Sequence, residues 1–155
     1  VVKLVPDFVR IYPVLVVEGS VLAELFRQGR YRPLSLGKAV VRTAWMKKYF
    51  DGHGIRVVRM GLQAGPELED SLVAGPYHPA FGELVRSRLM LQKVRLVLLE
   101  MNPERRVRLS ISDRDLSVFK GMHADNIRRL AELGLLERFD LATDAGQRRG
   151  TLKIR

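Results

Sequence analysis

The stretch VRIYPVLVVEG, residues 9–19, is the part of the sequence that decides the fold. Residues 9–17 are almost all apolar or β-branched, and a run of this length is typical of a strand that is buried on both faces, as in a parallel sheet. Pro13 cannot donate a hydrogen bond to a neighbouring strand, so we expect a bulge or an edge at mid-strand. Ser20 is well placed to cap a short helix over Val21–Gln28.

The elements after this helix indicate a strand–helix–strand unit. Ser35 can cap a second helix over Leu36–Phe50, whose apolar positions are predicted to include Trp45. A second strand is predicted over Ile55–Leu62, where apolar residues dominate. A helical connection of this length joins strands that lie parallel. The fold class is therefore predicted to be α/β.

Two longer segments follow the second strand. Gln63–Pro79 is rich in Gly and Pro and is predicted to be a long loop without regular structure, and such loops are often functional. Ala80–Met101 has a wide apolar face at helical spacing and is predicted to be a long helix. We place a domain boundary after this helix, which gives domains of residues 1–101 and 102–155.

The last third of the chain is predicted to be a small basic α/β unit. Val107–Ser112 alternates apolar and polar residues, as a half-exposed strand does. A helix is predicted over 124–133, and two further strands are predicted over 136–143 and 151–154.

Positive charge is concentrated in this C-terminal part. The whole chain has a formal net charge of +10, and residues 86–155 account for +7 of it. Lys and Arg release counterions when they contact phosphate, so a basic unit favours a polyanionic partner. The alternative is a solvated basic surface that only keeps the protein in solution.

Several kinds of chemistry are absent from the sequence. The chain has no cysteine, which excludes disulfides and thiolate metal sites and fits a cytoplasmic protein. None of the three histidines stands at metal-ligand spacing from another, so we expect no metal site. No nucleophile, phosphate-loop or dinucleotide motif occurs, and we assign no catalytic residue. No apolar run approaches the roughly 18 residues that span a bilayer, so we expect no membrane segment.

Three motifs, taken together, resemble one known family. They are RIYP (10–13) with GRY (29–31), then IRVVRMGLQ (55–63), then AGPYHPAF (74–81). In this order they resemble bacterial radical-SAM proteins related to the Elongator catalytic subunit. The resemblance implies that the two predicted strands belong to the last βα units of a partial (β/α) barrel. We expect the basic unit to be a small C-terminal α/β appendage to it.

The resemblance also implies cofactors and site residues. A radical-SAM enzyme holds a 4Fe–4S cluster through three cysteines and binds S-adenosylmethionine, so both are expected in the parent protein, and this chain has no cluster ligand. Gly61, Leu62 and Gln63 would lie near the bound S-adenosylmethionine. Arg10 and Tyr12 would line or brace the barrel.

The predicted long loop offers two more candidate residues. Tyr77 has a ring and a hydroxyl, and His78 can exchange protons near neutral pH. The loop follows the carboxyl end of the second strand, where ligands bind in α/β sheets. Both residues are therefore candidates for contact with a substrate. The structural alternative is that His78 caps the next helix.

The basic unit supports an alternative function. Its segment GMHA, residues 121–124, resembles the G-x-x-G loop of RNA-binding KH domains, although Ala124 replaces the second glycine. The candidate phosphate contacts are Arg105, Arg106, Lys120, Arg128 and Arg129. Under this alternative the chain is an RNA-binding module, for tRNA in view of the Elongator resemblance.

The main hypothesis is that the chain is a C-terminal fragment of a longer radical-SAM protein. Together with the parent's N-terminal region it would help to form the S-adenosylmethionine and substrate site, and alone it would be catalytically inert. A truncated barrel has unpaired strand edges, so we also expect the isolated chain to self-associate. A pure interaction domain is a third possibility.

Overall fold

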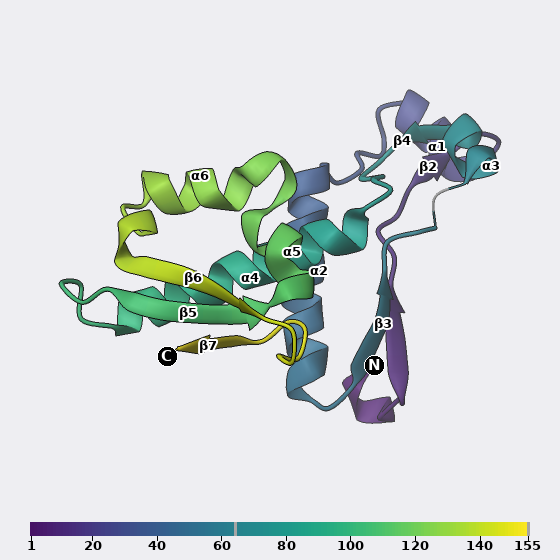
Figure 1. Cartoon of the computed structure of the whole chain (residues 1–155). Helices are drawn as coiled ribbons and strands as arrows, with labels where there is room; N and C mark the ends of the chain where they lie inside the picture. Colours follow the sequence, from purple (N-terminus) through teal and green to yellow (C-terminus); the bar gives the residue numbers. More distant parts are fainter. Residues whose placement is uncertain (64, 155) are drawn as a thin grey trace. The chain divides into compact units, whose positions relative to one another are not determined.

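The computed structural model describes residues 1–63 and 65–154, which divide into two compact units (Figure 1). The first unit is Val1–Val85, and the second begins at Arg86. This division lies inside helix α4 (Phe81–Glu100), whereas the sequence analysis placed a domain boundary after the helix. Each unit has its own cluster of buried apolar side chains.

The first unit is built on two parallel strands, β1 (Phe8–Ile11) and β3 (Arg56–Met60). The connection between them contains the helices α1 (Val21–Arg27) and α2 (Leu36–Gly52). The predicted parallel arrangement of the two strands is therefore confirmed. The class is mixed α/β with small sheets.

Both helices of the connection begin at the predicted capping serines. The Ser20 Oγ accepts a hydrogen bond from the Ala23 backbone N–H at 3.1 Å. The Ser35 Oγ accepts one from the Lys38 N–H at 3.4 Å. Each serine thereby satisfies a backbone donor that the first turn of a helix leaves without a partner.

The continuous strand predicted over residues 9–17 is wrong. β1 ends at Ile11, and a separate strand, β2 (Val16–Val17), pairs with β4 (Leu72–Ala74) in an antiparallel sheet. Pro13 lies between them and has no N–H for a strand ladder, so the chain changes sheets there. Burial on both faces is also wrong for β1, because Phe8 and Arg10 are exposed.

The segment predicted to be an irregular loop, Gln63–Pro79, contains regular structure. It includes helix α3 (Pro66–Ser71) and strand β4. Pro66 suits the first position of a helix, because the N–H that proline lacks would have no partner there. β4 is too short for sequence periodicity to detect, and its partner β2 supplies the pairing.

One face of the parallel pair is covered by α2. Ile11, Phe50 and Ile55 are buried together, and Val2, Val9, Met46 and Val57 pack against them. Apolar side chains from the two strands and from α2 thus meet on one side of the sheet. The opposite side receives the alternate residues of each strand.

Trp45 is not in this core, contrary to the prediction. Its side chain is 66% exposed and stacks on Tyr49 with a ring-centroid distance of 5.4 Å. The buried positions of α2 are Ala39, Thr43, Ala44 and Phe50. Trp45 directly follows Ala44, and successive helical residues point about 100° apart, so Trp45 projects away from the core.

The end of β3 is fixed by Gly61. Its N–H donates to the Ile11 carbonyl at 3.0 Å, which holds the ends of β1 and β3 together. Its φ is 82°, and a Cβ at this position would lie 2.7 Å from the Phe81 Cβ. Only glycine therefore allows the start of α4 to pack here without displacement.

The second unit contains a three-stranded sheet in the order β6–β5–β7. The central strand β5 (Val107–Ser112) is parallel to β6 (Phe139–Asp144) and antiparallel to β7 (Leu152–Ile154). The prediction of a half-exposed β5 is wrong, since all its residues except Arg108 are buried. A strand paired on both sides buries polar side chains as well, and the Ser110 hydroxyl is satisfied by Gln147.

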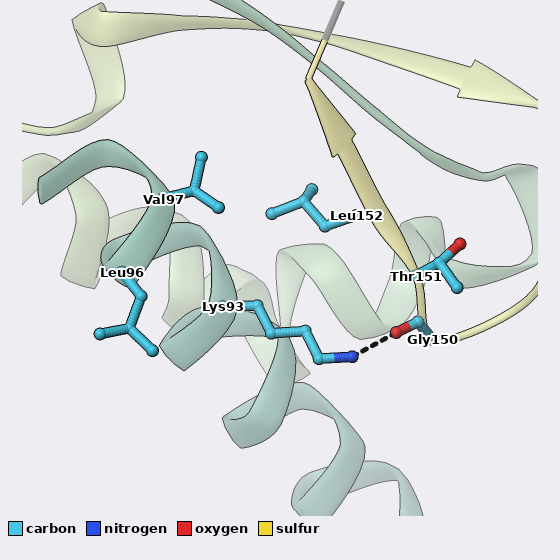
Figure 2. A pocket seen from close by; sticks show the side chains of 6 residues that line it. All are labelled: Lys93, Leu96, Val97, Gly150, Thr151 and Leu152. Carbon is cyan, nitrogen blue, oxygen red and sulfur yellow. Dashed lines mark hydrogen bonds between the residues drawn. The ribbon is translucent and has the colours of Figure 1, made fainter. Parts of the chain in front are cut away.

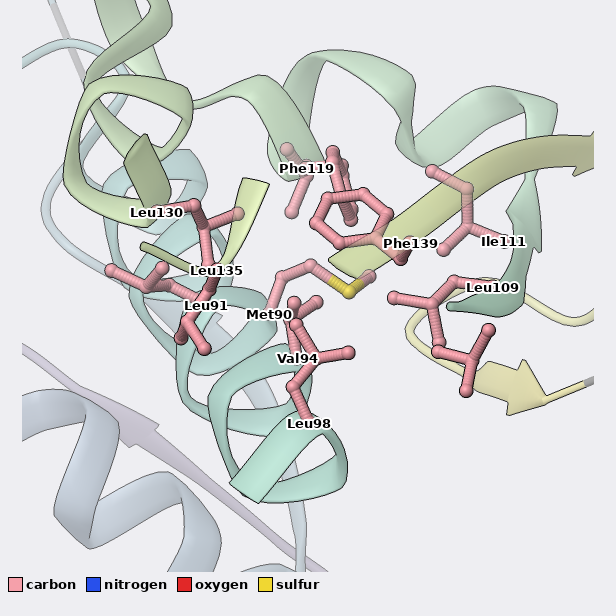
Figure 3. Close-up of a cluster of buried hydrophobic side chains, with 12 residues drawn as sticks. Met90, Leu91, Val94, Leu98, Leu109, Ile111, Phe119, Leu130, Leu135 and Phe139 are labelled. Carbon is pink, nitrogen blue, oxygen red and sulfur yellow. The ribbon is translucent and has the colours of Figure 1, made fainter. Parts of the chain in front are cut away.

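Two short helices complete the second unit, α5 (Leu116–Lys120) and α6 (Asp125–Glu132). Their apolar residues join those of the sheet and of α4 in one core (Figure 3). Phe119 and Phe139 meet edge to face in this core, with centroids 5.9 Å apart. Single 3₁₀ turns occur at Val2–Leu4, Asp113–Asp115, Met122–Ala124 and Leu136–Arg138.

We expect Gly61→Ala to destabilise the first unit more than Gly54→Ala. Both glycines have positive φ, which costs about 1 kcal/mol for alanine, but nothing lies within 4 Å of a Cβ at Gly54. At Gly61 the clash with Phe81 adds ~1–3 kcal/mol, as overpacking does. Urea unfolding followed by circular dichroism measures both losses. Equal losses would contradict this role of Gly61.

Candidate functional site

In α/β sheets, ligands bind at the carboxyl ends of the parallel strands. In the first unit this position is the carboxyl end of β1 and β3. The hydrogen bond from the Gly61 N–H to Ile11 places the ends of both strands at one edge. Tyr12 and Leu62 therefore leave the sheet at the same edge, and Gln63 follows. The structure thus brings together one predicted barrel residue and the three predicted cofactor-binding residues.

These residues differ in how far they are exposed. Gly61 is buried, Leu62 is half-buried and Gln63 is exposed. The close packing of Phe81 explains why position 61 requires glycine, so a bound ligand is not needed to explain this residue. The Gln63 side chain is the exposed polar group of the three, and its Oε1 accepts a long hydrogen bond of 3.5 Å from Arg59.

Tyr77 is engaged with Glu69 of α3. Its hydroxyl donates to the Glu69 Oε1 at 2.5 Å. This hydrogen bond raises the pKa of Tyr77, and partial burial and the negative charge of Glu69 act in the same direction. The contact ties α3 to the segment that follows β4, so the Tyr77 hydroxyl has a structural partner.

His78 caps the start of α4. Its Nδ1 accepts a hydrogen bond from the Ala80 N–H at 3.0 Å, and its carbonyl accepts one from the Phe81 N–H at 3.0 Å. These contacts match the structural alternative that the sequence offered for His78. A contact between His78 and a substrate stays a prediction.

The face of β1 and β3 that α2 does not cover is basic. We call it the open face, and its strand residues are Phe8, Arg10, Arg56 and Arg59. Phe8 is the register partner of Arg56, and Arg10 is the register partner of Arg59. Register partners in neighbouring strands project to the same side of a sheet. Arg10 and Arg59 therefore lie next to each other on the open face.

Sequence reasoning missed Arg56 and Arg59. Their spacing of three would put them on opposite faces of a regular strand. The register, however, shifts between Val9 and Arg10, so that Val57 and Arg59 face successive residues of β1 while Val58 is passed over. This bulge brings both arginines to the open face. The motif IRVVRM holds no local signal for it.

No carboxylate neutralises the open face within the described residues. β1 and β3 contain no Asp or Glu, and none of the three arginines forms an ion pair there. The contact of Arg59 with Gln63 involves a neutral amide. The open face thus carries three uncompensated positive charges beside an exposed aromatic ring.

The second unit has a shallow apolar hollow between α4 and β7 (Figure 2). Its lining residues are Lys93, Leu96, Val97, Gly150, Thr151 and Leu152. The Lys93 ammonium group donates to the Gly150 carbonyl, and the Gly150 N–H donates to buried Asp115. These polar groups at the rim are therefore hydrogen-bonded within the unit.

Three of the five predicted RNA contacts form ion pairs. Arg106 pairs with Asp140 at 2.7 Å, Arg128 with Asp125 at 3.0 Å, and Arg129 with Glu132 at 2.8 Å. All these side chains are more than half exposed, and exposed ion pairs contribute little to stability. The pairs do not prevent contact with phosphate, but they reduce the local positive charge.

The remaining two predicted contacts lie at different places. Lys120 is the last residue of α5, directly before the GMHA segment, and Arg105 precedes β5. The helix after the segment begins with Asp125 and then Asn126, whose side-chain amide is buried. That amide donates to Ser87 of α4 and to the carbonyls of Val118 and Phe119, so it fixes the helices rather than reaching a ligand.

The described residues include neither a candidate metal-ion cluster nor a candidate membrane-spanning helix. They contain no group of three or more His, Cys, Asp or Glu side chains that could hold a metal ion. In the same residues, no helix combines the length and the apolar character that a membrane crossing needs.

Comparison with known proteins identifies one family. The model of the family described as "Radical_SAM C-terminal domain" matches residues 6–90, which is more than half of the chain. The matched segment begins just before β1 and ends within α4, so it includes the whole carboxyl edge of the parallel pair. No curated protein and no solved structure matches the chain.

We expect Glu69→Gln to lower the pKa of Tyr77 toward its ordinary value. Because the folded pKa is raised, the contact stabilises the fold below the ordinary tyrosine pKa and is lost as the pH rises through the folded value. Tyrosine ¹³Cζ shifts measured against pH report the midpoint. Glu67→Gln, an exposed neighbour on α3, is the matched control. An unchanged Tyr77 midpoint in Glu69→Gln would refute the contact.

Proposed function

The chain belongs to the radical-SAM C-terminal domain family, and on this premise we propose that it closes the active site of a parent radical-SAM protein. The parent's N-terminal region would supply most of the barrel and the site for the 4Fe–4S cluster and S-adenosylmethionine. Family membership implies these two cofactors for the parent. The chain itself would act as a structural and substrate-contacting part of the site.

The cluster does not fit this chain. A 4Fe–4S cluster in such enzymes is held by cysteine thiolates, and the chain has none. For S-adenosylmethionine, Gly61 is already explained by packing, and Gln63 presents the exposed polar side chain. We propose that Gln63 contributes one contact at the rim of a cofactor site that the N-terminal region builds.

The observation that carries the proposal is the incomplete parallel sheet. Parallel sheets occur almost only with both faces covered, because their connections place helices on the faces. Here α2 covers one face, while on β1 and β3 the side chains of Phe8 and Val58 are 48% and 50% exposed. In the described residues each of these strands pairs only with the other. A neighbouring strand from the parent would complete the sheet.

A partial barrel is the architecture that this completion suggests. The helix α2 would belong to the outer layer, β1 and β3 would be the last strands, and the open face would look into the barrel. Arg10 and Tyr12 would then line the interior. The proposal includes a relation to bacterial Elongator-like proteins, which rests on the sequence motifs. It also includes a cytoplasmic location, which rests on the lack of cysteine.

RNA binding by the second unit is the second candidate function. The GMHA segment joins α5 to α6, and both His123 and Ala124 have positive φ, at 49° and 59°. This sharp turn exposes the segment between two helices, beside Lys120. Loops of this kind clamp a nucleic-acid backbone in KH domains.

We expect the coding sequence upstream of residue 1 to encode a C-x-x-x-C-x-x-C loop, and the encoded region to bind this chain through β1 or β3. Co-purification and amide hydrogen exchange measure the binding, which should protect the amides of both strands. Val58→Glu should weaken it, because a charge would enter the covered sheet.

The matched control is Leu99→Glu, an exposed apolar position of the second unit. It should leave co-purification unchanged. An upstream region without the three cysteines, or no added protection of β1 and β3, would reject the proposed function. Sedimentation of the isolated chain also tests the expected self-association through the same strand edges.

For the RNA candidate, we expect filter binding of a tRNA at micromolar affinity with a steep dependence on salt. Replacing Lys120 with Gln should lower the salt slope by about one, as the loss of one phosphate contact does. Lys3→Gln in the first unit serves as the control. Absence of binding at low salt would exclude the RNA-binding candidate.

A further inference from the structure

We propose that Arg10 and Arg59 form a binding site for a phosphate group of the parent protein's substrate. The inference rests on the proposed function, because the open face contacts a substrate only if it lines the parent's active site. The inference goes beyond the proposed function because it names a chemical class of substrate, a compound that carries phosphate. S-adenosylmethionine carries no phosphate, so the group would belong to the other reactant.

The geometry follows from the strand register. Arg10 and Arg59 are register partners in neighbouring parallel strands and project from the same side of the sheet. Both side chains are exposed. They lie one residue before the strand ends at Ile11 and Met60, close to the edge where α/β sheets bind ligands. Arg56 adds a third cation on the same face.

The neighbouring positive charges of Arg10 and Arg59 repel each other unless an anion binds between them. Like charges directly opposite each other in a sheet destabilise it. No carboxylate of the described residues pairs with either guanidinium, and Arg59 reaches only the Gln63 amide oxygen, at 3.5 Å. A regular strand would have separated Arg56 from Arg59, so the bulge at Val58 adds charge to the open face instead of dispersing it.

Phosphate fits the pair better than a carboxylate does. Each guanidinium presents a planar fork of donors that matches two oxygens of a phosphate. A phosphate monoester carries about −1.5 to −2 charge at neutral pH, which balances two arginines. A carboxylate carries one charge and would leave one guanidinium without compensation.

The test is a titration of the isolated chain with inorganic pyrophosphate at constant ionic strength. The Arg Nε–Hε NMR signals of Arg10 and Arg59 are expected to shift together and to saturate. Arg10→Gln and Arg59→Gln should each weaken binding about tenfold, the loss expected for hydrogen bonds to a charged group. Arg32→Gln, an exposed arginine of the same unit, should leave the affinity unchanged.

A second measurement separates binding from folding. Without pyrophosphate, Arg10→Gln and Arg59→Gln should melt at the same temperature as the unchanged chain or higher, because each removes a like-charge contact. Pyrophosphate should raise the melting temperature of the unchanged chain and of Arg32→Gln, but much less that of the two site variants.

Three results would overturn the inference. They are shifts that spread over all surface arginines, an affinity that survives both site variants, and equal shifts with acetate at the same concentration. The last result would mark the pair as a general anion or carboxylate contact. The outcome is independent of co-purification with the upstream region, so failure of the phosphate site and failure of the proposed function are distinguishable.

Discussion

At Gly61 a backbone hydrogen bond joins the ends of the two parallel strands, and the absence of a side chain leaves room for the start of α4. Its N–H holds β3 to the end of β1, and Phe81, the first residue of α4, fills the space where a Cβ would be. The two contacts act on the same residue, so the sheet edge and the start of α4 are positioned together. The candidate site residues Tyr12, Leu62 and Gln63 leave the sheet at this point.

The first unit buries only one face of its parallel sheet. Apolar residues of β1, β3 and α2 form its core, whereas the open face carries three arginines and an exposed phenylalanine. The chain belongs to the radical-SAM C-terminal domain family, and under the proposed function an N-terminal region of the parent protein would cover this face.

The second unit differs in this respect, since its sheet, α4, α5 and α6 close around a single core (Figure 3). The buried side chains of Asn126, Ser110 and Gln147 are hydrogen-bonded within the unit. The family match ends at residue 90 and covers only the first few residues of this unit. On the surface of the unit, ion pairs occupy three of the five arginine and lysine residues singled out from the sequence.

Local signals in the sequence determined the helix starts at Ser20 and Ser35, the parallel relation of the two strands and the long helix α4. Capping and hydrophobic spacing act over a few residues, and the parallel relation follows from the length of the helical connection between the strands. Tertiary structure alone decided that Pro13 divides a strand between two sheets, that Trp45 is exposed and that β5 is buried. It also decided the open face, because the bulge at Val58 arises from pairing with β1, and pairing partners far apart in sequence leave no local pattern.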